Sequence, residues 1–353
     1  MKSFKTEKVG ISSNEKLSLI SNLCTMLTAG IPILETINSL LEDAKGNQKK
    51  LLETIRDDLT QGNHLYSSFS KFPSIFNPVT VNIIRASEEA GTLEETLLDL
   101  KQNIRLEMEF IDKIKSALVY PLVIFVVFLG VLIMILTVVV PKITTVFISL
   151  NVKLPLQTKV LIFLSDIILK QTIPLLSVTA FLALGTFFLY KKQKRLVLSV
   201  LFSFPLVSKL IKQIDLVQFS RNLHLLLRSG ILITRALELT QNVVMRKDVS
   251  KGILHSKEVI ISGSKLSEGL KDFKETFPSI MIKIIEAGER SGSLDISMKE
   301  ITEYLDYEVS KTLKTLTVLI EPIMIVFVGG LIGGLMLSII APMYKMIGSI
   351  GTM

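Results

Sequence analysis

Three long stretches without a charged side chain constrain this chain more than any other feature. They occupy residues 118–140, 172–190 and 322–344 of the 353. At ~1.5 Å per helical residue the first and third reach about 35 Å, and the hydrocarbon core of a bilayer is ~30 Å thick. The sequence therefore predicts a polytopic membrane protein with three transmembrane helices.

Basic residues beside these stretches predict the orientation. Four of them, at positions 191–195, directly follow the second stretch and place that end in the cytoplasm by the positive-inside rule. Residues 1–16 carry charges and lack the apolar core of a secretory signal. We expect an inner-membrane protein with a cytoplasmic N-terminus and an extracytoplasmic C-terminus. Four lysines in the predicted outer loop, residues 141–171, conflict mildly with that orientation.

The sequence also contains an internal repeat. Matching residues are 200 positions apart at the start of the repeat and 201 positions apart in its later part. The motif Ala-x-Glu-x-x-Gly-x-Leu occurs at residues 86–93 and again at 287–294. One offset that holds across separate motifs indicates an internal duplication rather than chance. The matched positions include Gly30 and Gly230, Glu88 and Glu289, Gly91 and Gly292, Pro121 and Pro322, and Pro141 and Pro342.

Each repeat is predicted to be a bundle of helices. Apolar residues recur at three- and four-residue spacing from Leu19 to Leu27, and no useful alternating strand pattern occurs. Gly30 and Gly230 suit the left-handed end of the first helix in each repeat. The fold class is therefore all-α, with two homologous cytoplasmic helical-bundle domains and three transmembrane helices. The predicted boundaries are a first cytoplasmic domain 1–117, a helix 118–140, an outer loop 141–171, a helix 172–190, a second cytoplasmic domain 191–321, a helix 322–344 and an outer tail 345–353.

Two glutamates are the main candidate site residues. Glu88 and Glu289 each stand three residues before a repeated glycine, Gly91 or Gly292. Each carboxylate is open to three interpretations: a solvated group near a helix corner, a group that locks the corner or binds a partner, or a weak cation ligand.

The last helix of each repeat is expected to run directly into the membrane. Thr92 and Glu95 predict a capping box at the start of the first, and its helical pattern continues to Pro121, where a proline can kink a helix. Glu321 and Pro322 stand at the equivalent place in the second repeat. Glu321 is interpreted as a charge at the membrane interface, with a functional switch as the sharper alternative.

Glycines in the third apolar stretch predict close helix contact. Gly329 and Gly333 form one of two overlapping Gly-x-x-x-Gly pairs, which let helix backbones approach in lipid. The contact would lie within the chain or with another copy. Together with the duplication, the pairs favour a homo-oligomer.

Signatures of catalysis are missing from the sequence. It contains no Walker loop and no Gly-x-Ser-x-Gly elbow, and its three histidines and single cysteine, Cys24, form no metal-binding pattern. We therefore expect no enzyme activity, no cofactor and no metal. Nucleic-acid binding is not expected either, because no aromatic residues interleave the basic ones. The net charge is −2 over residues 1–117 and +6 over 191–321, which favours different partners for the two repeats.

The repeated Leu-x-x-Gly and Ala-x-Glu-x-x-Gly-x-Leu corners, with Tyr120-Pro121 and Glu321-Pro322, resemble the F-protein (GspF/PilC-like) family of type II secretion, type IV pilus and competence pilus machines. The resemblance covers about residues 14 to 345. It implies a cytoplasmic-membrane platform that couples a separate hexameric secretion ATPase to the assembly of pilin or pseudopilin subunits. Its implied partners are that ATPase, the pilins, other inner-membrane assembly proteins and the lipid bilayer.

Three other functions compete with this one. A membrane transporter built on an internal repeat is the main alternative, although the apolar stretches contain no ionisable residue. A membrane enzyme would need a nucleophile, base and oxyanion donor that no local motif supplies. A scaffold without motor coupling differs from the platform only in mechanism.

Overall fold

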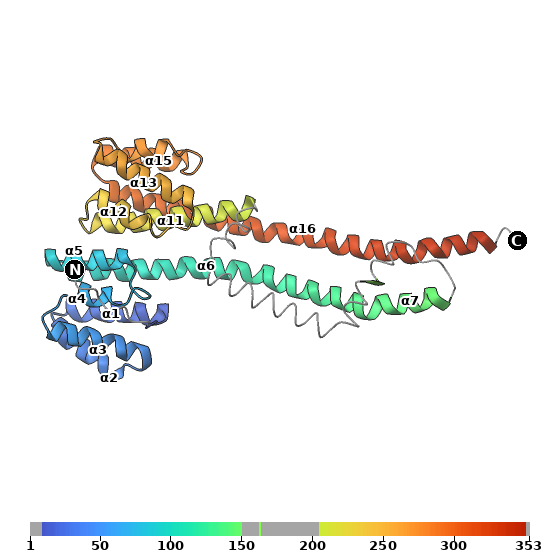
Figure 1. Ribbon diagram of the computed structural model, residues 1–353, viewed down its shortest axis with the longest axis horizontal. Helices are drawn as coiled ribbons and strands as arrows, with labels where there is room; N and C mark the ends of the chain where they lie inside the picture. Colours follow the sequence, from blue (N-terminus) through green and yellow to red (C-terminus); the bar gives the residue numbers. More distant parts are fainter. Residues whose placement is uncertain (1–8, 150–161, 164–204, 351–353) are drawn as a thin grey trace. The chain divides into compact units, whose positions relative to one another are not determined.

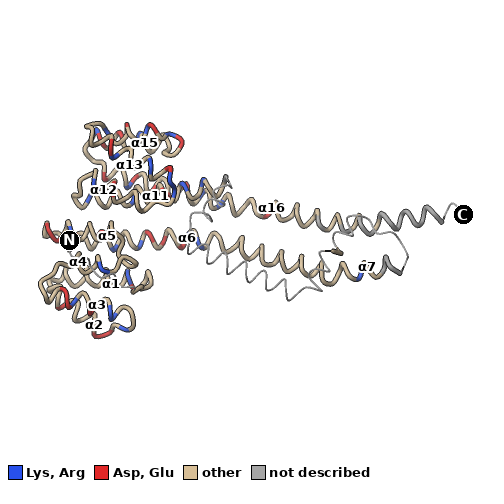
Figure 2. The backbone as a smooth tube through the Cα atoms, viewed as in Figure 1, with Lys and Arg blue, Asp and Glu red and all other residues tan. Residues whose placement is uncertain are grey.

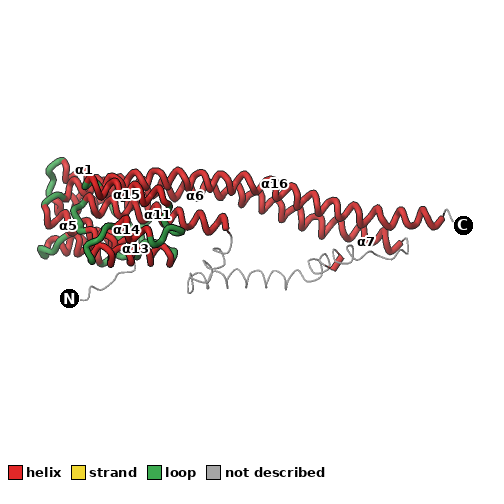
Figure 3. Tube along the Cα trace, turned by 90° about the horizontal axis from the view of Figure 1, so that it is seen from above, coloured by secondary structure: helices red, strands yellow, loops and turns green. Residues whose placement is uncertain are grey.

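A computed structural model shows the protein as a set of helices (Figure 1). The structure describes residues 9–149, 162–163 and 205–350. Over these residues all regular structure is helical and no strand is formed (Figure 3). The predicted all-helical class is therefore confirmed for the described residues. The predicted membrane helix 172–190 lies outside them.

Contacts divide the chain into two compact units. Unit 1 combines residues 1–113 with 209–310, and unit 2 combines 114–208 with 311–353. Unit 1 thus holds the helical bundles of both sequence repeats, which we call repeat 1 (residues 9–113) and repeat 2 (residues 209–310).

Helices follow one another in the same order in the two repeats. Those of the first are α1 (Ser13–Thr28), α2 (Ile33–Asp43), α3 (Gly46–Thr60), α4 (Leu65–Ser70), α5 (Pro78–Ala90) and α6 (Leu93–Met134). Those of the second are α11 (Pro205–Arg228), α12 (Ile233–Thr240), α13 (Lys247–Ile261), α14 (Leu266–Lys271), α15 (Ser279–Ser291) and α16 (Leu294–Ile350). Both α6 and α16 continue from unit 1 into unit 2.

The core of repeat 1 forms from the apolar faces of its helices. Leu19, Ile20 and Leu23 on α1 are almost fully buried, as their spacing predicts. Phe69 and Phe76 stack with ring centroids 3.9 Å apart. At the edge of this core Lys71 donates to both oxygens of Asp58, at 2.6 and 2.7 Å, and the Asp58 side chain is only 7% exposed.

Repeat 2 packs its helices around glycines where repeat 1 has larger residues. A Cβ atom added at Gly269 would lie 2.7 Å from the Cα of Ser256, so α14 and α13 touch closely there. At the matching position in repeat 1 stands Ser68. The ion pair near this place also differs, because His255 contacts Asp272 at 2.8 Å with both side chains largely exposed.

The first helices of the two repeats begin differently. In repeat 1, Ser12 and Glu15 form a capping box, in which the Glu15 carboxylate accepts from the Ser12 amide at 2.6 Å. The matching Asp215 instead accepts from the amides of Met245 and Arg246, at 2.9 and 2.7 Å, and holds the loop before α13. The capping box expected at Thr92 and Glu95 is not formed, because neither side chain hydrogen-bonds within the described chain. There α6 begins after a left-handed glycine instead.

Unit 2 exposes apolar side chains that water would not favour. Two helical stretches, Leu93–Lys142 and Leu294–Gly334, contain windows long and apolar enough to cross a membrane. Side chains such as Leu122, Val126 and Phe327 are more than half exposed. Charged residues gather on the helices of unit 1, including the first halves of these stretches, and are absent from residues 118–140 and 322–334 (Figure 2). Exposure of this extent indicates a surface made for lipid or for other apolar helices.

Beyond Met134 the first apolar helix changes its winding. A π-helical turn, η1 (Ile135–Val139), follows α6 and leads into α7 (Val140–Ser149). The Val140 amide donates to the Ile135 carbonyl, which is the five-residue step of a π-helix.

Candidate functional site

Glu88 locks the corner between α4 and α5. Its two carboxylate oxygens accept from the backbone amides of Leu65 and Tyr66, each at 2.8 Å, and its side chain is 13% exposed. These amides belong to the first turn of α4, whose N–H groups have no partner within the helix. A negative charge at this end also offsets the helix dipole.

Glu289 makes the same two bonds in repeat 2. Its oxygens accept from the amides of Leu266 and Ser267 in α14, at 2.5 and 3.2 Å. In both repeats the carboxylate oxygens are occupied by N–H groups. Of the three interpretations open for Glu88 and Glu289, this geometry favours corner locking over a solvated group or a cation site.

The repeated glycines form separate turns, with Gly91 between α5 and α6, Gly292 between α15 and α16, and Gly30 and Gly230 after the first helix of each repeat. Gly91 and Gly292 have φ angles of 71° and 70°, and Gly30 and Gly230 of 80° and 76°. A side chain is strained at such angles, so glycine allows the chain to turn directly from one helix into the next. Gly91 and Gly292 thus set the turns from which α6 and α16 begin, three residues after the glutamates that hold α4 and α14.

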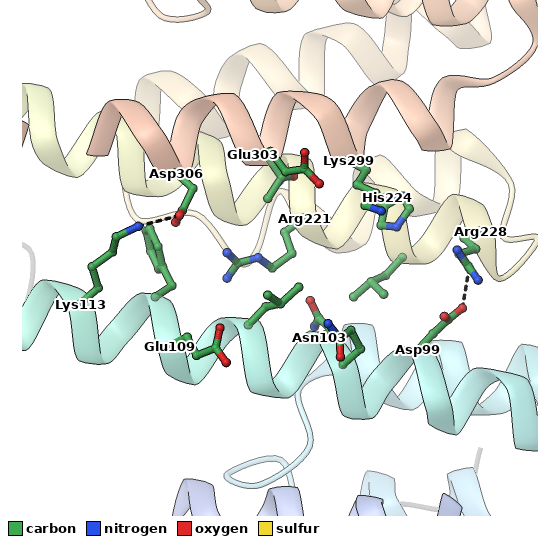
Figure 4. Close-up of a pocket in the computed structure, with 15 residues that line it drawn as sticks. Asp99, Asn103, Glu109, Lys113, Arg221, His224, Arg228, Lys299, Glu303 and Asp306 are labelled. Carbon is green, nitrogen blue, oxygen red and sulfur yellow. Dashed lines mark hydrogen bonds and ion pairs between the residues drawn. The ribbon is translucent and has the colours of Figure 1, made fainter. Parts of the chain in front are cut away.

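Helices from both repeats meet at a pocket in unit 1. The pocket has a volume of about 530 Å³ and lies between α6 of repeat 1 and α11 and α16 of repeat 2 (Figure 4). Two ion pairs bridge it: Lys113 to Asp306 at 2.9 Å, and Arg228 to Asp99 at 2.6 Å. We call this the inter-repeat pocket.

Arg221 is the most buried charged group that lines this pocket, with 7% of its surface exposed. It extends from α11 toward α6, and its guanidinium lies 5.1 Å from the centroid of the Phe110 ring (Figure 4). Its Nε and Nη1 atoms are sealed from solvent without an acceptor in the described structure. Burial lowers the pKa of Arg221, against the opposing fields of Asp306 and Glu107.

The sequence did not single out the inter-repeat pocket, because its residues come from three helices of two repeats. The sequence did contain one signal of the pocket. Arg221 interrupts a buried series on α11 that includes Leu216, Val217, Phe219 and Leu223. An arginine among buried apolar positions marks a charge that the fold must accommodate.

The two prolines and Glu321 all fall inside long helices. Pro121 lies within α6, and Glu321 and Pro322 lie exposed within α16. Both helices therefore continue through their proline in the described structure. Glu321 joins no ion pair in that structure, so its role as an interface charge or a switch stays a prediction.

Gly329 lines an apolar groove in unit 2. The groove has a volume of about 580 Å³ and lies between α6 and α16, with Val127, Val131 and Val328 among its walls. No described atom would lie within 4 Å of a Cβ added at Gly329 or Gly333. The structure does not bring the predicted partner helix onto these glycines within its described residues.

Comparisons with known proteins agree with the duplicated fold. A family model described as type II secretion system (T2SS), protein F, matches residues 19–141 and again residues 219–342. Type IV pilus assembly protein PilC of Thermus thermophilus is 32% identical over 336 residues, which cover 93% of this chain and 81% of that protein.

The relatives include proteins named for type IV pilus assembly and proteins named for type II secretion. PilC of Pseudomonas aeruginosa is 28% identical, over 93% of this chain and 89% of that protein. Type II secretion system protein F of Aeromonas hydrophila is 25% identical, over 96% of this chain and 87% of that protein. The two matches to the model together cover more than half of the sequence. The chain therefore belongs to the type II secretion system protein F family.

Proposed function

We propose that this chain is the inner-membrane platform of a type II secretion, type IV pilus or competence pilus machine, and that it couples a separate hexameric ATPase to pilin or pseudopilin assembly. Its family and the names of its relatives support the platform role. The observation that carries the coupling is the continuity of α6 and α16, each of which begins in a helical bundle and ends in an apolar stretch.

The proposed topology keeps both bundles in the cytoplasm. The membrane helices are residues 118–140, 172–190 and 322–344, with an outer loop at 141–171 and an outer tail at 345–353. Two exposed apolar helices and the family assignment support an inner-membrane location. Cysteines placed singly in the predicted outer loop and in repeat 2, in a Cys24→Ser background, would test the topology. Labelling of intact cells by an impermeant maleimide at position 153 but not at position 274 is the expected result, and the reverse would overturn it.

The proposed coupling runs along the two long helices. An ATPase that moves either bundle would move the start of α6 or α16, which begins after the turn at Gly91 or Gly292. Lys113 and Asp306 join these helices just before the chain enters unit 2. A motion of one bundle would therefore reach both membrane helices. A rigid helix is needed for this, because a flexible segment would absorb the displacement.

An insertion tests that requirement directly. Four glycines inserted after Ser116 would interrupt α6 just inside unit 2 and before its apolar stretch, and assembly of filaments should be lost while the protein still reaches the membrane. The matched control places the same glycines after Asn63, in an exposed turn between α3 and α4. Full assembly with the Ser116 insertion would contradict coupling through α6 and leave a scaffold without motor coupling.

The partners are tested by purification. The chain would be taken from its native membrane in a mild detergent through a C-terminal tag, and the proteins that accompany it identified by mass spectrometry. A hexameric ATPase together with pilin-like proteins is the expected result. If a solute-binding component came instead, a transporter would replace the platform.

The two bundles are expected to bind the ATPase unequally. Repeat 2 carries exposed lysines such as Lys251, Lys265 and Lys283, in a segment of net charge +6. Changing these three to glutamate should weaken ATPase binding more than changing the exposed Glu35, Glu42 and Glu94 of repeat 1 to lysine. Equal effects would show that the basic repeat is not the main binding surface.

A further inference from the structure

The inter-repeat pocket contains an unusual pair of unsatisfied groups. Nε and Nη1 of Arg221 have no acceptor in the described structure, and Oδ1 of Asp306 is buried there without a donor. The other oxygen of Asp306 already binds Lys113 at 2.9 Å. Buried polar atoms normally have a hydrogen-bond partner, and a buried charge without one is costly. A group in the pocket that both accepts and donates would satisfy the two residues together once their side chains turn these sealed atoms toward it.

The ion pairs around the pocket show which of its charged side chains already have a partner. Two cations are already paired, because Lys113 contacts Asp306 and Arg228 contacts Asp99. Glu109 is paired outside the pocket with Arg105, at 3.0 Å.

Unpaired charge in the pocket is therefore mainly positive. Among the lining residues, Arg221 and Lys299 remain as cations without a partner in the described structure, against Glu303 as the one such carboxylate. Arg221 is buried, whereas Lys299 and Glu303 are both exposed. The least satisfied charge at the centre of the pocket is therefore positive.

The walls of the pocket suit an organic ligand rather than water alone. Leu106, Phe110 and Leu225 provide apolar surface, and Gln102 and Asn103 add amide groups. A volume of about 530 Å³ lies within the range of ordinary small-molecule sites, ~300–1,000 Å³. His224 lines the same wall, with Nδ1 held by the Asp295 carbonyl at 2.7 Å, so Nε2 is the ring atom left for a ligand.

We propose that the inter-repeat pocket binds a phosphate ester that carries a free hydroxyl, with its phosphate on Arg221 and Lys299 and the hydroxyl donating to Asp306. Arginine suits this role because its planar donors match phosphate oxygens, and the Phe110 ring holds the guanidinium in place. The ester is either a soluble metabolite or the headgroup of a phospholipid. A bound ligand would contact both repeats and so stabilise their association.

The test uses the full chain in nanodiscs, in phosphate-free buffer at constant ionic strength. Three probes are compared with chloride: inorganic phosphate, glycerol 3-phosphate, and phosphatidylglycerol in place of phosphatidylcholine in the disc. The readouts are the thermal midpoint and the hydrogen exchange of α6 and α11. We expect a saturable rise in midpoint and slower exchange. A response to glycerol 3-phosphate identifies a soluble ester, and a response to phosphatidylglycerol alone identifies a lipid headgroup.

Variants locate the response. Arg221→Met should weaken binding at least about tenfold, since hydrogen bonds to a charged group are lost. Without ligand it should be no less stable than the native chain, because it removes a buried charge that has no partner. Arg221→Lys, which keeps the charge but loses the planar fork, should bind with intermediate strength. The control is Arg290→Gln, which changes an exposed arginine of repeat 2 that is paired with Glu286 away from the pocket and should leave the response unchanged.

Two results would overturn the proposal. One is the absence of a saturable response to all three probes. The other is a response that persists unchanged in Arg221→Met, which would place the anion elsewhere on the protein.

Discussion

Repeat 1 and repeat 2 share their corners but not their packing. Both have a glutamate that holds the first turn of the fourth helix, and both use left-handed glycines at matching turns. Between those fixed points the contacts differ. Repeat 1 buries a lysine–aspartate pair and packs a serine where repeat 2 has an exposed histidine–aspartate pair and a glycine. Residues that determine the backbone path were thus kept in both copies, while residues that fill space diverged.

The largest difference between the repeats should come from their ion pairs. Lys71→Met would leave the buried Asp58 carboxylate without its cation and should cost repeat 1 about 3 kcal/mol, whereas His255→Gln, on an exposed pair, should cost less than about 1 kcal/mol. Hydrogen exchange of the full chain, read separately for α3 and α13, measures both. Equal losses would mean that burial does not distinguish the two pairs.

Loss of a corner glutamate should affect the repeats equally. Glu88→Ala and Glu289→Ala each remove two charge-assisted bonds to backbone amides and should cost about 2 kcal/mol in local stability. Faster exchange of the first-turn amides of α4 and α14 is the measurement. Glu89→Ala, next to the corner but paired with exposed Arg85, serves as the control and should change little. A large effect in only one repeat would break the equivalence.

Substitutions at the matching helix contacts of the two repeats should change stability in opposite directions. Gly269→Ala forces a Cβ against the Ser256 backbone and should cost about 1–3 kcal/mol. Ser68→Ala, at the matching position, removes a buried hydroxyl that has no partner in the described structure, and should be neutral or slightly stabilising. Thermal unfolding of the two variants compares them. Similar destabilisation by both would show that the two interfaces are equally tight.

The smallest effect concerns pH. Bonds to Ser12 lower the pKa of Glu15, whereas burial raises the pKa of Asp215 at the matching position. The contribution of Glu15 is therefore present above its unfolded pKa and is lost as the pH falls through its folded value. Asp215 behaves oppositely, because its contribution declines as the pH rises from its unfolded to its folded pKa. The unfolding midpoints of Glu15→Gln and Asp215→Asn are each compared with that of the native chain across mildly acidic pH. As the pH falls, the native chain should lose stability relative to Glu15→Gln and gain stability relative to Asp215→Asn. Parallel curves would contradict this.

Local signals in the sequence predicted much of the fold. The glycine turns, the helical periodicity and the run of α6 through Pro121 each depend on residues close together in the chain, and the duplication supported them twice. The start of α6 just after Gly91 was predicted correctly, but the capping box that Thr92 and Glu95 fit by pattern is not formed. The hydrogen-bond partners of Glu88 lie more than twenty residues away in the sequence, so they could not be predicted. Only the position of Glu88 relative to Gly91 was evident.

The inter-repeat pocket could not be predicted for a related reason. Arg221, Phe110 and Asp306 come from helices far apart in the sequence, and no repeat contains all three. Their meeting depends on how two bundles associate. That association rests on complementary surfaces, which differ between the copies, and periodicity within one helix carries no information about it.

The π-helical turn at Ile135–Val139 changes the rotational phase of the first apolar helix. A residue accommodated in a wider turn shifts all later side chains by about 100° around the helix axis relative to an uninterrupted α-helix. Pro141 follows directly, and its ring would clash with the Thr137 carbonyl in a regular helix, so the wider turn makes room for it. The backbone of α7 is therefore rotated about the helix axis relative to an unbroken continuation of α6. Deleting one residue from this turn would rotate the later residues back by the same angle with almost no change in composition. Such a variant would separate the effect of the direction in which residues face from the effect of their hydrophobicity.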